Sequence, residues 1–152
     1  MLLLVTVIVN SKTFNDMATS KSRHNHLIRI AENVLQNNDT GLLNTDKTQA
    51  ENESYNGKIA AFGVSIAMTG LLPTLAIYYS DKESRETILR NILETIGKMI
   101  YADRNNSGPI NNAESLLRYT ISHENERRLK QDIIDCSIAL KQVFRTYLDP
   151  EQ

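Results

Sequence analysis

The sequence predicts an all-α fold, a compact single-domain bundle of about five to six helices, preceded by an N-terminal segment expected to be disordered or extended. Three observations support this class. Turn-forming residues are scarce, with six glycines and three prolines in 152 residues, whereas a β-sandwich or barrel needs frequent turns. Aromatic residues make up only 6% of the chain and tryptophan is absent. Apolar residues recur at spacings of three and four along several long segments, which places them on one face of a helix.

The first nine residues, MLLLVTVIV, are almost wholly apolar. The run is too short to span a bilayer, which takes ~20 residues. It also lacks the basic region before it and the small-residue cleavage site after it that a secretory signal has. We interpret residues 1–16 as an N-terminal extension, or as the product of a start codon placed too early, because Met17 offers an alternative start. Residues 17–152 then form a single all-helical domain.

The first predicted helix runs from Ser20 to about Asn37. Its apolar residues share one face: Leu27, Ile30, Ala31, Val34 and Leu35. Basic side chains cluster at its start, which is unfavourable against the helix dipole. They indicate either an anionic partner or a solvated, fraying helix end. The following stretch, Asn37 to Ser54, is rich in Asn, Asp, Thr and Gln and predicts a loop.

The stretch from Tyr55 to Lys82 is the longest weakly charged run in the chain, and Lys58 is its only charged residue before Asp81. A run of this kind normally forms a central element that other helices cover. Gly70 is expected to end one helix. Pro73 is expected at the first position of a second, short helix that continues to the tyrosine pair. The stretch therefore predicts two helices separated by a tight break.

The C-terminal half predicts three more helices. Ser80 and Glu83 have the spacing of a capping box and open a long helix to about Ala102. Gly97 within it indicates a close helix crossing, because it otherwise costs helix propensity. A loop and two helices complete the chain, at about Asp103–Asn112, Ala113–Thr120 and Ser122–Leu148.

Residues that could carry chemistry show no catalytic or metal-binding pattern. His24 and His26 are two residues apart, on different sides of a helix, whereas metal ligands on a helix favour a spacing of four. Cys136, the only cysteine, falls on the apolar stripe of the last helix, which is typical of a core residue. Asp132 and Asp135 are predicted to lie on a solvated face. We therefore expect no enzyme activity, no cofactor and no metal site.

The net charge of the chain is −1, so any contact with nucleic acid depends on local basic groups. Such groups contact phosphates without reading the base sequence. Each one taken singly is more simply an ordinary surface charge.

Residues 66–82, IAMTGLLPTLAIYYSDK, resemble the signature of the small subunit of the type III-B CRISPR effector, the Cmr small subunit. That family has a tyrosine-led helix, a Gly-Leu turn, a small-residue helix and a loop ending in lysine. Here these features fall on Tyr55, Gly70–Leu71, Thr74–Tyr79 and Lys82. The resemblance is sharp over the stretch from Tyr55 to Lys82 and general over the rest of the domain. Many members have Asn where this chain has Thr69, and a more basic approach to the turn.

The resemblance implies a non-catalytic helical subunit of a cytoplasmic ribonucleoprotein that contributes to antiviral defence. Copies would stack into a short filament, line the groove where guide RNA pairs with target RNA, and contact the large subunit and other Cmr effector subunits, with no membrane involved. RNA contact would be to backbone and shape, because base pairing reads the sequence. The candidates for RNA-backbone contact are Lys21, Arg23, Lys58, Lys82, Arg85, Arg127, Arg128 and Lys130. The alternative is a helical protein–protein adaptor or regulatory module with no nucleic-acid role.

Overall fold

The computed structural model describes residues 21–37, 40–43, 49–80 and 88–148. Five labelled helices follow a helix at residues 21–37: α2 (Gln49–Thr69), α3 (Leu71–Tyr79), α4 (Ile88–Asp103), α5 (Ala113–Ser122) and α6 (Arg127–Thr146). Since no strand occurs in the described ranges, the all-α prediction is confirmed. The predictions for residues 1–16 and for the capping box that includes Glu83 lie outside these ranges.

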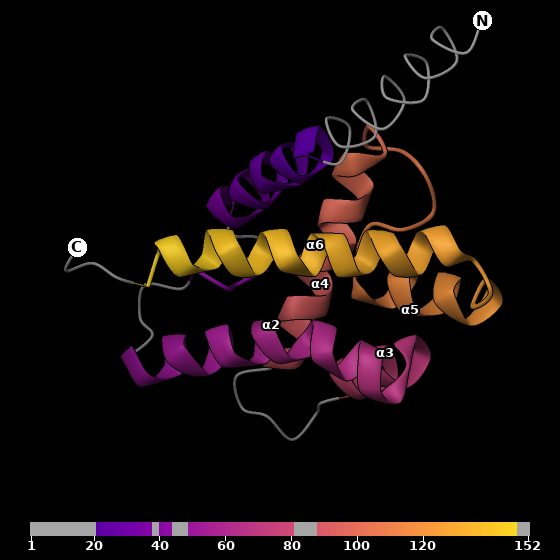
Figure 1. The fold of residues 1–152 in the computed structure, drawn as a ribbon, viewed down its shortest axis with the longest axis horizontal. Helices are drawn as coiled ribbons and strands as arrows, with labels where there is room; N and C mark the ends of the chain where they lie inside the picture. Colours follow the sequence, from indigo (N-terminus) through magenta and orange to yellow (C-terminus); the bar gives the residue numbers. More distant parts are fainter. Residues whose placement is uncertain (1–20, 38–39, 44–48, 81–87, 149–152) are drawn as a thin grey trace, which may run out of the picture.

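The helices pack around two long antiparallel neighbours, α2 and α6. In Figure 1 these two run side by side and α4 crosses behind both of them. α3 folds back on α2 and also contacts α4 and α5, while α5 packs on α4. The helix at residues 21–37 lies against α4 and α6, to which Arg23 hydrogen-bonds. Within the described residues, no helix is both long and apolar enough to cross a membrane.

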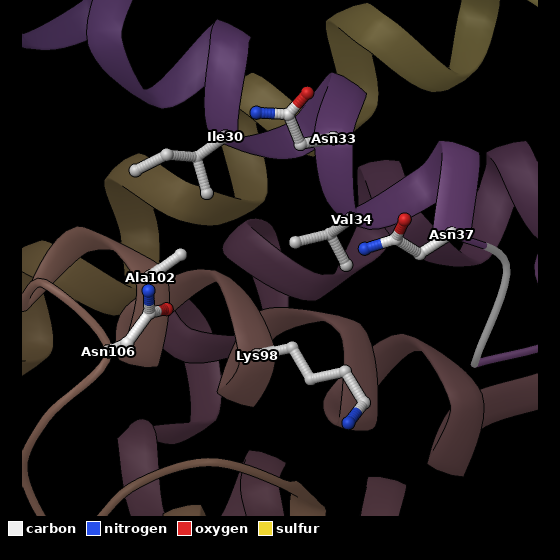
Figure 2. Close-up of a pocket in the computed structure, with 7 residues that line it drawn as sticks. All are labelled: Ile30, Asn33, Val34, Asn37, Lys98, Ala102 and Asn106. Atoms are coloured by element: carbon white, nitrogen blue, oxygen red, sulfur yellow. The ribbon is translucent and has the colours of Figure 1, made fainter.

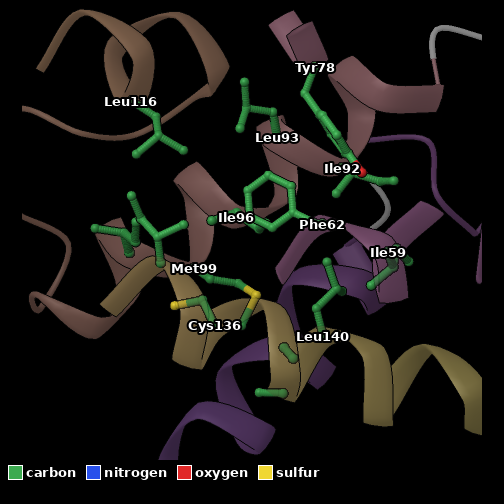
Figure 3. Close-up of a cluster of buried hydrophobic side chains, with 14 of the residues drawn as sticks. Ile59, Phe62, Tyr78, Ile92, Leu93, Ile96, Met99, Leu116, Cys136 and Leu140 are labelled. Carbon is green, nitrogen blue, oxygen red and sulfur yellow. The ribbon is translucent and has the colours of Figure 1, made fainter. Parts of the chain in front are cut away.

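Every described helix contributes to one hydrophobic core. Figure 3 shows its centre, where the ring of Phe62 from α2 lies between Ile96 of α4 and Leu140 of α6. Leu116 brings α5 into the same cluster, and Leu27 does so for the helix at residues 21–37. Each fully buried side chain of this size contributes roughly 1.5–3 kcal/mol relative to an exposed one. The i, i+3 and i, i+4 pattern of the sequence is therefore the pattern of burial.

The start of α2 corrects the predicted loop between Asn37 and Ser54. α2 begins at Gln49, because the residues there include Gln, Ala and Glu, which are good helix formers. Tyr55, which is buried, anchors this first part of the helix by stacking on Phe144 of α6, with 6.4 Å between ring centroids. Once that anchor holds, the helix extends toward its N-terminus at little cost.

The break between α2 and α3 is confirmed, with one correction. Gly70 has φ of 102°, a backbone conformation that side chains with a Cβ rarely adopt. α3 begins directly after it, at Leu71, so Pro73 is the third residue of the helix and not the first. A proline is accommodated there because the first turn of a helix has no intrahelical partner for its N–H groups.

The junction between α5 and α6 also differs from the prediction. α5 continues to Ser122, and α6 begins at Arg127 and not at Ser122. The residues between them form a turn, in which the His123 ring stacks on Tyr119 with 3.9 Å between centroids. This stacking, together with the hydrogen bond from the His123 backbone N–H to Thr120 O at 3.1 Å, ends α5 and redirects the chain.

Gly97 allows a close approach between α4 and the N-terminal cap of α5. A Cβ at this position would lie 2.5 Å from the backbone oxygen of Asn112. We expect Gly97→Ala to lower the free energy of unfolding by about 1–3 kcal/mol, because backbone atoms must move to accept the methyl group. Urea denaturation followed by circular dichroism measures this change.

Gly57 is the matched control for this substitution. It also lies inside a helix, but a Cβ there would meet nothing within 4 Å. Gly57→Ala is expected to raise the free energy of unfolding by about 0.4–1 kcal/mol, since alanine restricts the unfolded chain. Equal effects of the two substitutions would show that the contact with Asn112 does not limit α4.

Candidate functional site

The α2–α3 pair is fastened by an aromatic contact and a hydrogen bond. The Tyr78 hydroxyl donates to the backbone oxygen of Lys58 at 2.9 Å, and the Tyr78 ring meets Phe62 edge to face with 4.9 Å between centroids. Burial raises the pKa of Tyr78 to about 12. The Lys58 side chain itself is exposed, so these contacts fix the helix from which it projects.

Three hydroxyl groups bridge the break between the two helices. Ser65 and Thr74 lie 2.8 Å apart through their side-chain oxygens, and Thr69 is 3.2 Å from Thr74. Thr69 also donates to the Ser65 backbone oxygen at 2.7 Å. Thr74 is fully buried, so this cluster satisfies a polar group inside the protein. It holds the direction in which α3 leaves α2.

Five of the predicted RNA-contact residues are exposed, and they lie at separate places on the surface. Arg127, Arg128 and Lys130 are exposed together in the first turn of α6, and Lys21 and Lys58 are exposed elsewhere. Lys58 lies beside the C-terminal half of α6, because its neighbours Ile59 and Ala60 line the same groove as Lys141. Lys141 is roughly 20 Å along the helix axis from the first turn of α6. Lys82 and Arg85 lie outside the described residues.

Arg23, also predicted to contact RNA, is engaged inside the protein. It donates to both carboxylate oxygens of Asp103 at 3.2 and 3.0 Å and to Asp132 at 2.9 Å, and its side chain is 28% exposed. The hydrogen bond to Asp103 raises the pKa of Arg23, against the effect of its burial. This geometry favours a structural role for Arg23 over contact with phosphates.

Asp132 corrects the prediction of a solvated acidic face. It is 6% exposed, and Arg23, Arg104 and Arg128 all lie within 4.0 Å of its carboxylate. A buried carboxylate needs such partners because desolvation penalises its charge. The helical periodicity of the sequence already indicated that Asp132 is buried, since it falls on the same stripe as the core residues Leu129, Ile133 and Cys136. We call Arg23, Asp103 and Asp132 the arginine cluster.

The groups with catalytic potential do not converge. Cys136 is buried as predicted, and burial raises the pKa of its thiol, so the nucleophilic thiolate is disfavoured. His24 pairs with Gln142 at 2.8 Å, His26 lies 3.3 Å from Asp103, and His123 stacks on Tyr119. Among the described residues, no group of three or more histidines, cysteines or carboxylates could hold a metal ion.

An exposed apolar groove runs between α2 and α6, with a volume of about 320 Å³. Small and branched residues form its walls: Ala60, Gly63, Val64 and Ala67 from α2, and Ile134 and Ile138 from α6. Outside the groove, Met68 of α2 is 79% exposed and Ile77 of α3 is 55% exposed. Exposed apolar surface such as the groove typically marks a contact with another molecule. We call it the apolar groove.

A second groove of about 320 Å³ lies between the helix at residues 21–37 and α4. Figure 2 shows its lining, which combines three carboxamides and one ammonium group with aliphatic side chains: Asn33, Asn37, Asn106, Lys98, Ile30, Val34 and Ala102. We call it the amide groove. The sequence alone did not predict it, because its two walls are far apart along the chain. Its only local signal is the i, i+4 spacing of Asn33 and Asn37.

No protein-family model, no curated protein and no solved structure matches the chain.

Breaking the arginine cluster should destabilise the protein. We expect Arg23→Met to lower the free energy of unfolding by about 2–4 kcal/mol, because it leaves Asp132 buried with only its weaker partners. Arg128→Met is the control, since that side chain is 79% exposed and its distance to Asp132 is 3.9 Å. It should cost about 0–0.5 kcal/mol. Urea denaturation of both variants measures the difference, and equal values would contradict a structural role for Arg23.

Tyr78 should make stability depend on pH in the alkaline range. Its phenol ionises near pH 10 in an unfolded chain and at about 12 in the folded protein. Its contribution is therefore complete below about pH 10 and is lost as pH rises toward 12, since only the unfolded state releases the proton in that window. The free energy of unfolding should fall less steeply there in Tyr78→Phe than in the wild type. Parallel curves would contradict the raised pKa.

Proposed function

We propose that this chain is a non-catalytic helical subunit of a type III-B CRISPR ribonucleoprotein and contributes to antiviral defence. Copies stack into a short filament that lines the groove between guide RNA and target RNA. The observation that carries the proposal is the stretch from Tyr55 to Tyr79. It resembles the signature of the Cmr small subunit, and it folds into two helices that expose the apolar residues Val64, Met68 and Ile77.

The uncovered face supports a subunit of an assembly. A helix that is apolar around most of its circumference is normally covered on all sides. α2 buries Phe62 and Ile66 against the core, yet Val64 and Met68 on its other side are exposed. A neighbouring copy or the large subunit seated on the apolar groove would cover them. Aromatic and aliphatic residues with few charges are typical of the centre of such an interface.

The exposed cations support contact with an RNA backbone. Lys58 projects near one end of the apolar groove, and Arg127, Arg128 and Lys130 project from the first turn of α6 near the other. Cations at this separation can contact phosphates along one strand without reading its sequence. Lys21 stays in the proposed set. Lys82 and Arg85 remain predictions, and the proposed location of the complex is the cytoplasm.

A protein–protein adaptor with no nucleic-acid role is the second candidate. The apolar groove favours it equally, because any protein partner could cover that surface. The net charge of −1 is also compatible with it. The two candidates differ in whether the exposed cations meet phosphates, so binding of RNA separates them.

RNA binding should depend on salt and on the named cations. We expect the protein to bind single-stranded RNA, with an affinity that falls steeply as salt rises. The triple variant Lys58→Glu/Arg127→Glu/Arg128→Glu should bind more weakly. The slope of log affinity against log salt should become shallower by about 0.7 for each phosphate that the variant no longer neutralises. Fluorescence anisotropy with a labelled RNA across a salt series measures both quantities.

Arg145→Glu is the control for this variant. Arg145 is exposed near the C-terminal end of α6 and is not in the proposed set, so its reversal should leave the salt slope unchanged. If the triple variant and the wild type bind RNA identically at every salt concentration, the RNA assignment of these cations is wrong and the adaptor is favoured.

A further inference from the structure

We propose that the amide groove holds one unstacked nucleotide of a bound RNA strand. The base would lie in the groove and its phosphate on Lys98. This inference rests on the proposed function as an RNA-lining subunit. The exposed cations contact only the RNA backbone, whereas this site would contact the edge of a base. The groove lies between the helix at residues 21–37 and α4, and none of the residues first named for RNA contact lines it.

The size and floor of the groove suit a flat heterocycle. Its volume of about 320 Å³ is at the lower end of the range for small-molecule sites, which is ≈ 300–1,000 Å³. Ile30, Val34 and Ala102 supply aliphatic surface from both walls. An unstacked base has two apolar faces that must be covered once it leaves its neighbours in the strand.

The carboxamides suit the edge of a base. Figure 2 shows the amides of Asn37 and Asn106 on opposite walls and toward opposite ends of the groove, beside Val34 and Ala102, with Asn33 along the upper rim. No described residue hydrogen-bonds to any of these three amide groups. Each amide carries both donors and an acceptor, and the edges of bases present donors and acceptors side by side. Within the described part of the chain these amides therefore have no side-chain or backbone partner and are available to a ligand.

Asn106 is held in place for such a contact. Its backbone has φ of 57°, a left-handed conformation that asparagine tolerates better than most residues. Its N–H donates to the Tyr101 oxygen at 2.9 Å, which fixes the residue directly after the last turn of α4. The amide is thus presented from a defined position, and less entropy is lost when it binds.

Lys98 supplies the positive charge. Its ammonium is 4.0 Å from the Glu94 carboxylate and its side chain is 34% exposed, so the pair is loose and contributes little. A phosphate could replace Glu94 as its partner. A free anion alone is a poorer match for the groove, since three neutral amides and an aliphatic floor accompany a single cation.

The test compares an RNA strand that has bases with an abasic strand of the same length. The variant Asn37→Ala/Asn106→Gly removes one amide from each wall of the groove, and glycine keeps the left-handed backbone at residue 106. We expect it to bind the base-containing strand about tenfold more weakly, because two sets of hydrogen bonds are removed. Its affinity for the abasic strand should equal that of the wild type. Lys98→Gln should weaken binding to both strands.

Asn25→Ala is the matched control, because Asn25 is exposed on the same helix and does not line the groove. Circular dichroism confirms that each variant is folded, and Lys98→Gln gives an independent reading should the double variant unfold. If the groove variants bind both strands like the wild type while the triple charge variant is weakened, the groove proposal is overturned and the proposed function stands. If the wild type binds no RNA, both are overturned.

Discussion

The guanidinium of Arg23 is the contact on which the arrangement of the N-terminal helix depends. It joins that helix to Asp103 at the end of α4 and to Asp132 in the second turn of α6. Both carboxylates lie at the surface of the core, where an unpaired charge would be costly. Any displacement of the helix at residues 21–37 would separate the arginine from two carboxylates at once. The shape of the amide groove therefore also depends on Arg23, because the helix at residues 21–37 forms one of its walls.

A different principle governs α2 and α3. Few ion pairs involve them among the described residues, and their positions follow from close packing, the hydroxyl cluster around Thr74 and the conformation of Gly70. Many Cmr small subunits, which the stretch from Tyr55 to Lys82 resembles, have asparagine where Thr69 stands here, and the threonine hydroxyl takes part in that cluster. The inner faces of α2 and α3 are thus held by contacts with the core, while Val64 and Met68 on the outer face of α2 are exposed. A subunit that must present an apolar face to a neighbour needs this arrangement.

The sequence predicted the helices well and their ends less well. Apolar periodicity identified the helix at residues 21–37 and helices α4 and α6, whereas α2 and α3 followed from the weakly charged run and from Gly70 and Pro73. The polar start of α2 was mistaken for a loop, since Gln49 to Ser54 depend on the anchor that Tyr55 forms with Phe144, a residue far along the chain. The position of Pro73 depended on the conformation of Gly70, which composition does not specify.

The candidate surfaces followed from the sequence only in part. Exposed cations such as Arg127 were recognisable, but the engagement of Arg23 required knowledge of which carboxylates lie opposite it. Asp132 could have been placed by its phase on α6. The amide groove could not, since Asn37 and Asn106 are brought together only by the packing of two helices.

The proposed role as an RNA-lining subunit of a CRISPR effector is tested most directly by capture of the tagged protein from the cells that make it. The retained RNA is sequenced and the retained proteins are identified. We expect short guide RNAs derived from CRISPR repeats, together with a large subunit and further effector subunits. Recovery of the protein with partners but with no guide RNA would contradict it.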